Sequence, residues 1–429
     1  MSCYIKKFCS CLLILALCLG LCPIAQGEEA VHIVFWHSMS EEAGEILQTL
    51  VDEFNQTNQQ NIYVEAVFQG KYSDATGKMN NILSAASWNE LPDVMNLDAT
   101  GKVNFYQSGK MYSVDAALAD EPGWDVSVYE PTAYANWCYA GVQLGIPFAT
   151  STTLTYYNKS LVPDGIDTLG DLAALQGTTG EAAVFACVPA TPTLVNWLGQ
   201  QGSLLTDMEN GTLGSAGQVV CLENGALEAF LGVWKALYAS GALKNESESI
   251  EDFVSGKLAV MLYSSSHIVS IQEKIGGSFE LGIGFYPRVD ENASCGATVN
   301  GSCLVMFDSG DETRKQAART FVQYMTGADA QARFCAATGY LPSHTGAEQT
   351  PVYQAFLQQN PLFYTALEQV KETPSAMRSL TVGPSVDFYY AIQNNIMDML
   401  DEDWSAEETA LILTEELNGL LQRYNRNNQ

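Results

Sequence analysis

The stretch Gly145-Ile-Pro-Phe-Ala-Thr-Ser-Thr-Thr-Leu-Thr-Tyr-Tyr-Asn-Lys159 is the most informative segment of this chain. Pro147 interrupts an apolar run, and hydroxyl side chains cluster at 150–153. Leu154 and Tyr156 then occupy alternate positions, as they would in a half-buried strand. We expect this order, a proline followed by hydroxyl side chains and then a strand, where a chain passes from one lobe of a protein to another. The segment therefore predicts two lobes that meet at about residue 148.

The N-terminus carries the pattern of an export signal. Lys6 and Lys7 precede an apolar run, and Ala25-Gln-Gly27 offers a small-x-small cleavage site. The apolar run is short for a membrane-spanning helix. We expect cleavage after Gly27, which makes residues 1–27 a signal peptide and the mature protein secreted. Lipid attachment at Cys22 is the alternative, although Leu21 stands where a small residue is usual.

Composition limits the classes of partner. The net charge of −29 becomes −31 once Lys6 and Lys7 leave with the signal. Such a chain repels the phosphates of nucleic acids and anionic lipid surfaces. Because 47% of the residues are hydrophobic and 16% are charged, we expect a packed globular protein. Six cysteines follow the signal without C-x-x-C spacing, so a zinc site is not expected. Export permits disulfides, but we expect buried free thiols for most of these cysteines.

Strand and helix patterns alternate along the chain, which predicts an α/β fold with largely parallel sheets covered by helices. Val31–Phe35 reads as a strand, and Glu41–Asn55 repeats apolar residues at helical spacing. Further elements are expected at Ile62–Phe68, Asp74–Ala86, Pro92–Leu97, Leu227–Ala239, Arg314–Met325 and Ser405–Tyr424.

Several short motifs occur in a specific order: Phe35-Trp-His-Ser38, Leu91-Pro-Asp-Val94, Pro147–Lys159, Phe253-Val-Ser-Gly-Lys-Leu-Ala-Val-Met261 and Thr338-Gly-Tyr-Leu-Pro342. In this order, residues 31–424 resemble an extracellular solute-binding protein of an ABC importer. More specifically, the chain resembles the carbohydrate-type family that includes maltose-binding protein. Within it, the Gly70-Lys-Tyr72 turn and the Pro-Phe-x-x-Ser-Thr segment are most similar to the subfamily that binds glycerol-3-phosphate.

The resemblance implies a two-lobed fold that closes on a ligand between its lobes. It places residues 28–148 and 283–327 in an N-terminal lobe, and residues 149–282 and 328–429 in a C-terminal lobe. It also implies an ABC permease as the partner, with a sugar, polyol or glycerol-phosphate-type solute and no cofactor. We expect a monomer.

The resemblance and the side-chain chemistry together select ten candidate ligand-binding residues. Tyrosine and tryptophan rings can stack on a sugar, hydroxyls can bridge its oxygens, and a glycine turn lets backbone N–H groups approach it. For Trp36 and for Trp197, two interpretations stay open: each lines the cleft or belongs to the core of a lobe. The full set is Trp36, Tyr72, Asp98, Ser151, Trp197, Ser264, Asn300, Gly301, Tyr340 and Arg378.

Two positions depart from the glycerol-3-phosphate subfamily. Its acidic residue falls at Ala99, with Asp98 as a neighbouring substitute, and its phosphate-binding arginine is absent from 381–390. Arg378 is the cation nearby in sequence. A guanidinium grips a phosphate with two hydrogen bonds, so its loss favours a neutral sugar, a polyol or a glycerophosphodiester.

Enzymatic function is not favoured. The chain contains no G-x-S-x-G, H-E-x-x-H or G-x-x-x-x-G-K-[ST] motif. Its four histidines leave few candidates for a catalytic triad, and His37 has no second histidine at metal-binding spacing. A secreted carbohydrate-binding adhesin, or a carbohydrate-active enzyme using paired carboxylates, remains the alternative.

Overall fold

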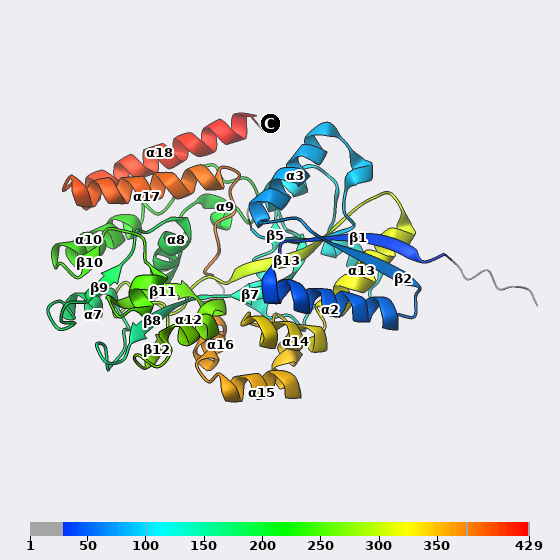
Figure 1. Ribbon diagram of the computed structural model, residues 1–429. Coiled ribbons are helices and arrows are strands. Elements are labelled where there is room, and N and C mark those ends of the chain that lie inside the picture. The colour runs from blue at the N-terminus through cyan, green and yellow to red at the C-terminus, as the bar shows by residue number, and fades with distance from the viewer. Residues whose placement is uncertain (1–28, 100, 375, 428–429) are drawn as a thin grey trace, which may run out of the picture.

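The computed structural model describes residues 29–99, 101–374 and 376–427 (Figure 1). The predicted signal peptide and the alternative lipid-attachment residue Cys22 lie outside the described residues. The described chain forms two main sheets and a short hairpin, with helices packed around both sheets. No described helix is both long enough and apolar enough to cross a membrane.

The first sheet has the strand order β2-β1-β3-β13-β4, and β7 also pairs with β13. Strands β1, β2 and β3 run parallel, whereas β13 runs antiparallel to β3, β4 and β7. The strands are β1 (Val31–His37), β2 (Ile62–Phe68), β3 (Val94–Leu97), β4 (Met111–Tyr112), β7 (Gly145–Ser151) and β13 (Asn300–Phe307).

The second sheet has the order β10-β9-β11-β8-β12. Its strands β10, β9 and β11 are parallel, and β8 is antiparallel to both β11 and β12. The strands are β8 (Thr153–Asn158), β9 (Ala183–Ala186), β10 (Leu243–Lys244), β11 (Leu258–Ser264) and β12 (Leu281–Gly284), and the separate hairpin is β5 (Cys138–Tyr139) with β6 (Val142–Gln143).

The expectation of largely parallel sheets is therefore wrong in part. Parallel pairing holds where a helix connects neighbouring strands, as α2 connects β1 to β2. Antiparallel pairing occurs where the chain enters one sheet from the other, at β8 after β7 and at β13 after β12. A strand that arrives from outside the sheet is not bound by the crossover rule that keeps βαβ strands parallel.

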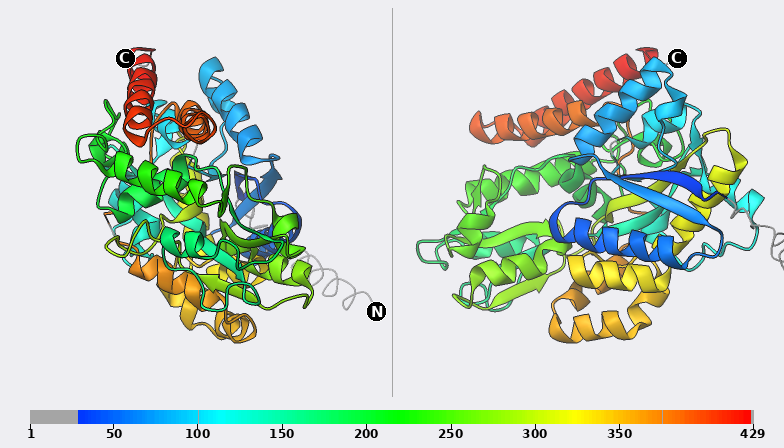
Figure 2. Two further views of the ribbon diagram at one scale, coloured as in Figure 1. Left: turned by 90° about the vertical axis from the view of Figure 1, so that its left-hand side faces the viewer. Right: turned by 45° about the vertical axis from the view of Figure 1, so that its right-hand side comes forward.

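The helices surround these sheets, with α17 and α18 side by side along the second sheet and α14 beside α2 near the first (Figures 1 and 2). They are α2 (Glu41–Thr57), α3 (Tyr72–Ala85), α4 (Lys102–Gln107), α5 (Val114–Asp120), α6 (Pro131–Ala135), α7 (Leu169–Ala174), α8 (Thr191–Gln200), α9 (Asp207–Asn210), α10 (Ala226–Ala239), α11 (Ile250–Val254), α12 (Ile268–Ile275), α13 (Glu312–Met325), α14 (Ala328–Thr338), α15 (Pro351–Gln359), α16 (Phe363–Glu372), α17 (Ser385–Asp401) and α18 (Ala406–Asn427), with single 3-10 turns η1 (Trp88–Glu90), η2 (Ser265–His267) and η3 (Thr345–Gln349).

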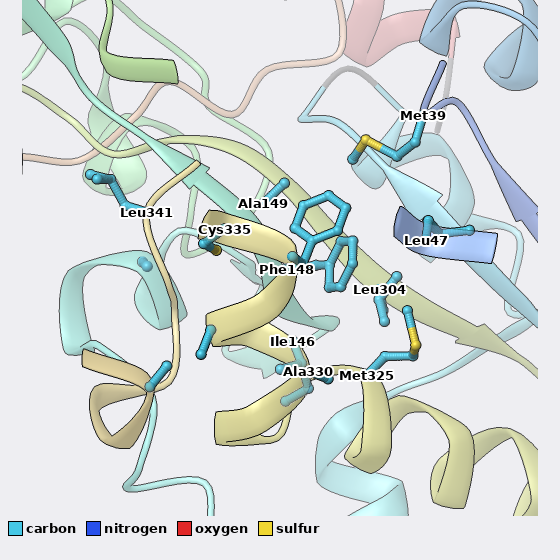
Figure 3. Close-up of a cluster of buried hydrophobic side chains, with 14 of the residues drawn as sticks. Met39, Leu47, Ile146, Phe148, Ala149, Leu304, Met325, Ala330, Cys335 and Leu341 are labelled. Carbon is cyan, nitrogen blue, oxygen red and sulfur yellow. The ribbon is translucent and has the colours of Figure 1, made fainter. Parts of the chain in front are cut away.

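Hydrophobic packing continues beneath the junction of the sheets. Phe148 of β7 lies with its ring centroid 4.5 Å from that of Phe334 on α14, and Leu304 and Met325 belong to the same buried cluster (Figure 3). This cluster also includes Leu154 of β8. Core packing thus holds both the strand before the β7–β8 junction and the strand after it.

Two elements pack on a different sheet from the one that the predicted lobe boundaries gave them. Strand β12 pairs with β8 in the second sheet, although residue 283 was expected to begin a return to the first lobe. Helix α14 packs against α2 and β7 of the first sheet, although residues from 328 onward were expected in the second lobe. The closure of two lobes on a ligand stays a prediction.

The six cysteines within the described residues are all free thiols. Four of them are buried, and Cys138 and Cys295 are partly exposed. This arrangement agrees with the expectation of unpaired thiols.

Candidate ligand-binding site

A cavity of about 300 Å³ lies where the two sheets meet. The first sheet contributes the residues that follow β3 and the facing parts of β7 and β13. The second sheet's side contributes the first turn of α8. The chain segment at Ser379 and Leu380 completes the wall. Because both halves of the molecule supply its lining, this cavity is the best candidate for the predicted ligand site.

Three of the predicted residues line this cavity: Asp98, Asn300 and Gly301. Asn300 begins β13 and is paired in register with Ser151 on β7. Gly301 has a φ of 122°, and a Cβ atom there would lie 1.8 Å from the carbonyl oxygen of Ala149. Only glycine allows β7 and β13 to approach so closely at the cavity wall.

Tyr72 lies at the start of α3 and forms a chain of polar contacts with the first sheet. Its hydroxyl donates to Asn96 Oδ1 at 3.0 Å, and Asn96 Nδ2 donates to Ser302 Oγ at 2.8 Å. Burial raises the pKa of Tyr72, and the charges of Tyr340 and Asp98 raise that pKa further.

Tyr340, Ser151 and Ser264 surround the β7–β8 junction without lining the cavity. The Tyr340 ring is stacked on Phe334 with centroids 6.1 Å apart. Ser151 is the last residue of β7, next to Thr150 on the cavity wall. Ser264 ends β11 opposite Thr153, and its hydroxyl is hydrogen-bonded to Ser266 Oγ at 2.9 Å.

Trp197 is a correction to the prediction. Its side chain is fully buried, stacked on Phe230 at 4.9 Å, and its indole N–H donates to the Pro287 carbonyl oxygen at 3.1 Å. It has no exposed surface for a solute because α8 buries residues on both sides of the helix. Trp197 is therefore a core residue of the second sheet.

Arg378 and Trp36 also stand outside the cavity lining. The Arg378 Nε lies 3.7 Å from Glu209 Oε2, and its carbonyl oxygen accepts a hydrogen bond from Asn210 at 2.8 Å. The guanidinium of Arg378, the candidate cation near the missing arginine, is thus paired with a carboxylate outside the cavity lining. Trp36 is partly buried and packs against the cluster around Met95 beside α3.

Lys102 is the main residue that the sequence prediction missed. It begins α4, is 2% exposed and lines the cavity. Its ammonium donates to the Asn136 carbonyl oxygen at 2.7 Å and lies 5.7 Å from the centroid of the Trp137 ring. Burial lowers the pKa of Lys102 to about 8, partly offset by Cys303 and Cys138.

Asn136 connects Lys102 to the opposite wall. Its side-chain amide donates to the Val299 carbonyl oxygen, just before β13. Thr298, on the same segment, donates from both its N–H and its hydroxyl to Asn196 of α8, at 2.9 and 2.8 Å. The cavity wall is therefore held in place from both sheets. No cluster of His, Cys, Asp and Glu suited to a metal ion occurs among the described residues.

Comparison with known proteins now identifies the class. Residues 49–363 match the family model described as bacterial extracellular solute-binding protein. The chain belongs to this family. The predicted family, its two-lobed fold class and the role as the substrate-binding component of an ABC importer are thereby confirmed.

Individual relatives are similar over nearly their whole length. The sn-glycerol-3-phosphate-binding periplasmic protein of Yersinia pestis is 24% identical over 403 residues, which cover 90% of each chain. The structure of UgpB from Mycobacterium tuberculosis in complex with glycerophosphocholine has a TM-score of 0.72 at 20% identity, covering 92% of this chain and 99% of the other. The sugar-binding protein MalE from Xanthomonas citri has a TM-score of 0.74 at 19% identity, with 92% and 98% covered.

Proposed function

We propose that the cavity between the sheets holds one small polar solute of the sugar, polyol or glycerol-phosphate type, which the protein delivers to an ABC permease. The observation that carries this proposal is the composition of the cavity wall. Asp98 and Lys102 from one side and Thr191 from the other converge on a space of about 300 Å³. Polar groups that converge in this way beside an aromatic wall, here Trp137, suit a hydroxylated solute. The names of the relatives, which include glycerol-3-phosphate, glycerophosphocholine and sugar binders, support the same range of solutes.

We also propose that the two sheets, each with its covering helices, are lobes that close on this solute. The lobes would be joined at Ser151–Thr153 and between Gly284 and Asn300, where the chain passes from one sheet to the other. Closure strips water from a polar solute and gives the permease a distinct shape to recognise. These junctions lie close to the boundaries expected at 148 and 283.

The remaining parts of the proposal concern cell biology. Residues 1–27 direct export, and the mature protein acts outside the cytoplasmic membrane as a monomer without a cofactor. It binds its solute and catalyses no reaction, as is usual in a family of solute-binding proteins. A carbohydrate-binding adhesin or a carbohydrate-active enzyme would instead bind or cleave polysaccharide.

The test is a thermal-shift panel with the mature protein. The panel contains glycerol-3-phosphate, glycerophosphodiesters, and mono- to trisaccharides. A solute at 100 times its dissociation constant stabilises the protein by about 2.7 kcal/mol, which is readily seen as a rise in Tm. A flat panel, combined with binding or cleavage of polysaccharide, would overturn the proposal.

A further inference from the structure

The Lys102 ammonium has more hydrogen-bonding capacity than the protein uses. An ammonium carries three donors, and among the described residues this one makes a single hydrogen bond, to the Asn136 carbonyl oxygen. Within the described part of the chain, no carboxylate lies within ion-pair distance of Lys102. A buried charge is costly without a partner of opposite sign. This lysine therefore faces the cavity as a desolvated cation whose remaining N–H groups can serve a ligand.

Two hydroxyls on other parts of the wall are similarly uncommitted. Thr191 at the start of α8 and Ser379 on the segment before α17 both line the cavity. Among the described residues, neither Thr191 Oγ1 nor Ser379 Oγ has a hydrogen-bond partner, and both atoms are buried. A buried cation and two buried hydroxyls without partners among the described residues thus belong to the lining of one cavity, and each can donate to an oxyanion.

Asp98 limits how much negative charge the cavity accepts. Its carboxylate lines the same space as Lys102. A second anionic group close to Asp98 is repelled, whereas solute hydroxyls can donate to a carboxylate. One cation and one carboxylate therefore fit a hydroxylated solute with a single negative charge better than they fit a dianion.

We propose that the solute is a hydroxylated monoanion, and that Lys102 is the residue that selects it by pairing with its anionic group. A phosphodiester and a carboxylate share this chemistry. The inference rests on the proposed function, because it assumes that the cavity is the solute site. It narrows the expectation that followed from the missing arginine, which included neutral sugars and polyols beside glycerophosphodiesters. The cation lies on α4 of the first sheet, far in sequence from the segment 381–390 where one was sought.

The experiment compares four solutes against wild type, Lys102→Met, Lys102→Arg and Lys110→Met by isothermal titration calorimetry at pH 7. The solutes are a glycerophosphodiester, glucuronate, neutral glucose and dianionic glycerol-3-phosphate. Lys110 is the matched control because its ammonium lies 4.7 Å over the Trp88 ring, outside the cavity lining. Thermal melts without solute establish that each variant is folded.

We expect one of the two monoanions to bind wild type most tightly, and which one does identifies the anionic group. Lys102→Met should weaken that binding by about 10- to 100-fold, the loss typical of a hydrogen bond to a charged group. Lys102→Arg should restore part of it, and Lys110→Met should bind as wild type does. Should Lys102→Met fail to fold, the wild-type protein supplies the test, because affinity for the monoanion should fall above pH 8 while affinity for glucose stays constant.

Tight binding of glucose that Lys102→Met leaves unchanged would overturn this inference and leave the proposed function standing. Tighter binding of glycerol-3-phosphate than of either monoanion would overturn the single-charge assignment. Failure of every solute in the wider thermal-shift panel would instead remove the proposed function.

Discussion

Tyr72 and Tyr340 are the two tyrosines among the predicted ligand-binding residues. Replacing either by alanine should weaken solute binding by on the order of 1–3 kcal/mol, the range for loss of a buried hydrogen-bonding partner. Because Tyr72 donates to Asn96 and Tyr340 stacks on Phe334, some loss of stability should accompany the change. Calorimetric titration separates the two effects. Wild-type affinity in both folded variants would remove these tyrosines from the site.

Lys102 also makes stability depend on pH. Its pKa is about 8 in the folded protein and 10.5 in the unfolded chain. Between these values the unfolded chain binds more protons, so this group makes the free energy of unfolding rise with pH. Burial raises the pKa values of Cys303 and Cys138, and the charges of these two thiolates would in turn raise the pKa of Lys102. Asp98 lines the same cavity, and the charge of Arg378 lowers the pKa of Cys138.

Urea unfolding of wild type and Lys102→Met at pH 7 and pH 9.5 measures this contribution. The stability of wild type relative to Lys102→Met should increase with pH. A difference that stays constant would show that the lysine is not desolvated.

At the level of elements, α16 holds both junctions between the sheets through one side chain. The fully buried Gln369 donates to Thr152 Oγ1 at 2.7 Å and to the Thr153 carbonyl oxygen at 2.8 Å. Its side-chain oxygen accepts from the Tyr286 N–H at 2.6 Å, on the segment between β12 and β13. Gln369→Met should lower the free energy of unfolding by about 2–3 kcal/mol, since buried backbone groups lose their partner. The exposed Gln358→Met on α15 should change it little, and equal denaturation midpoints for the two variants would contradict this role.

Helix α18 makes a second connection, away from the junctions. Tyr424 donates to Asn104 Oδ1 on α4 at 2.9 Å, and its ring covers Gly383. If the lobes open and close, this contact belongs to the closed arrangement, and Tyr424→Ala should favour the open one. We expect a larger radius of gyration in X-ray scattering without solute, and weaker solute binding. Tyr424→Phe keeps the ring and should show the smaller change, whereas identical scattering from all three proteins would show that the contact does not hold the lobes.

Amphipathic helices were predictable and tertiary burial was not. Helix α2 extends over Glu41–Thr57 against an expected Glu41–Asn55, because its apolar residues recur at helical spacing. Trp197 could not be assigned to core or cleft, because α8 is buried around most of its circumference and has no informative polar face. Lys102 was missed for the opposite reason. A lysine is normally exposed, and only the packing of α4 under Trp137 buries this one.

For the whole molecule, export can be tested by mass. If the signal is cleaved after Gly27, the secreted protein begins at Glu28 and carries a net charge of −31. Intact-mass spectrometry of protein secreted by a bacterial host should show this chain without added lipid. A lipid-modified N-terminal Cys22, retained with the membrane fraction, would instead establish the anchored form.

Strand β13 has a consequence for how the protein is made. It is the neighbour of β3, β4 and β7 at once, yet it is synthesised after every other strand of both sheets. A nascent chain that has emerged only as far as β12 has all its second-sheet strands, while β3 and β7 still lack their shared partner. Such long-range pairing is slow, because the entropy of closing a large loop is lost before the strands gain any stabilising contact. The first sheet therefore stays incomplete until residue 307 has emerged, so we expect it to finish folding after the second sheet.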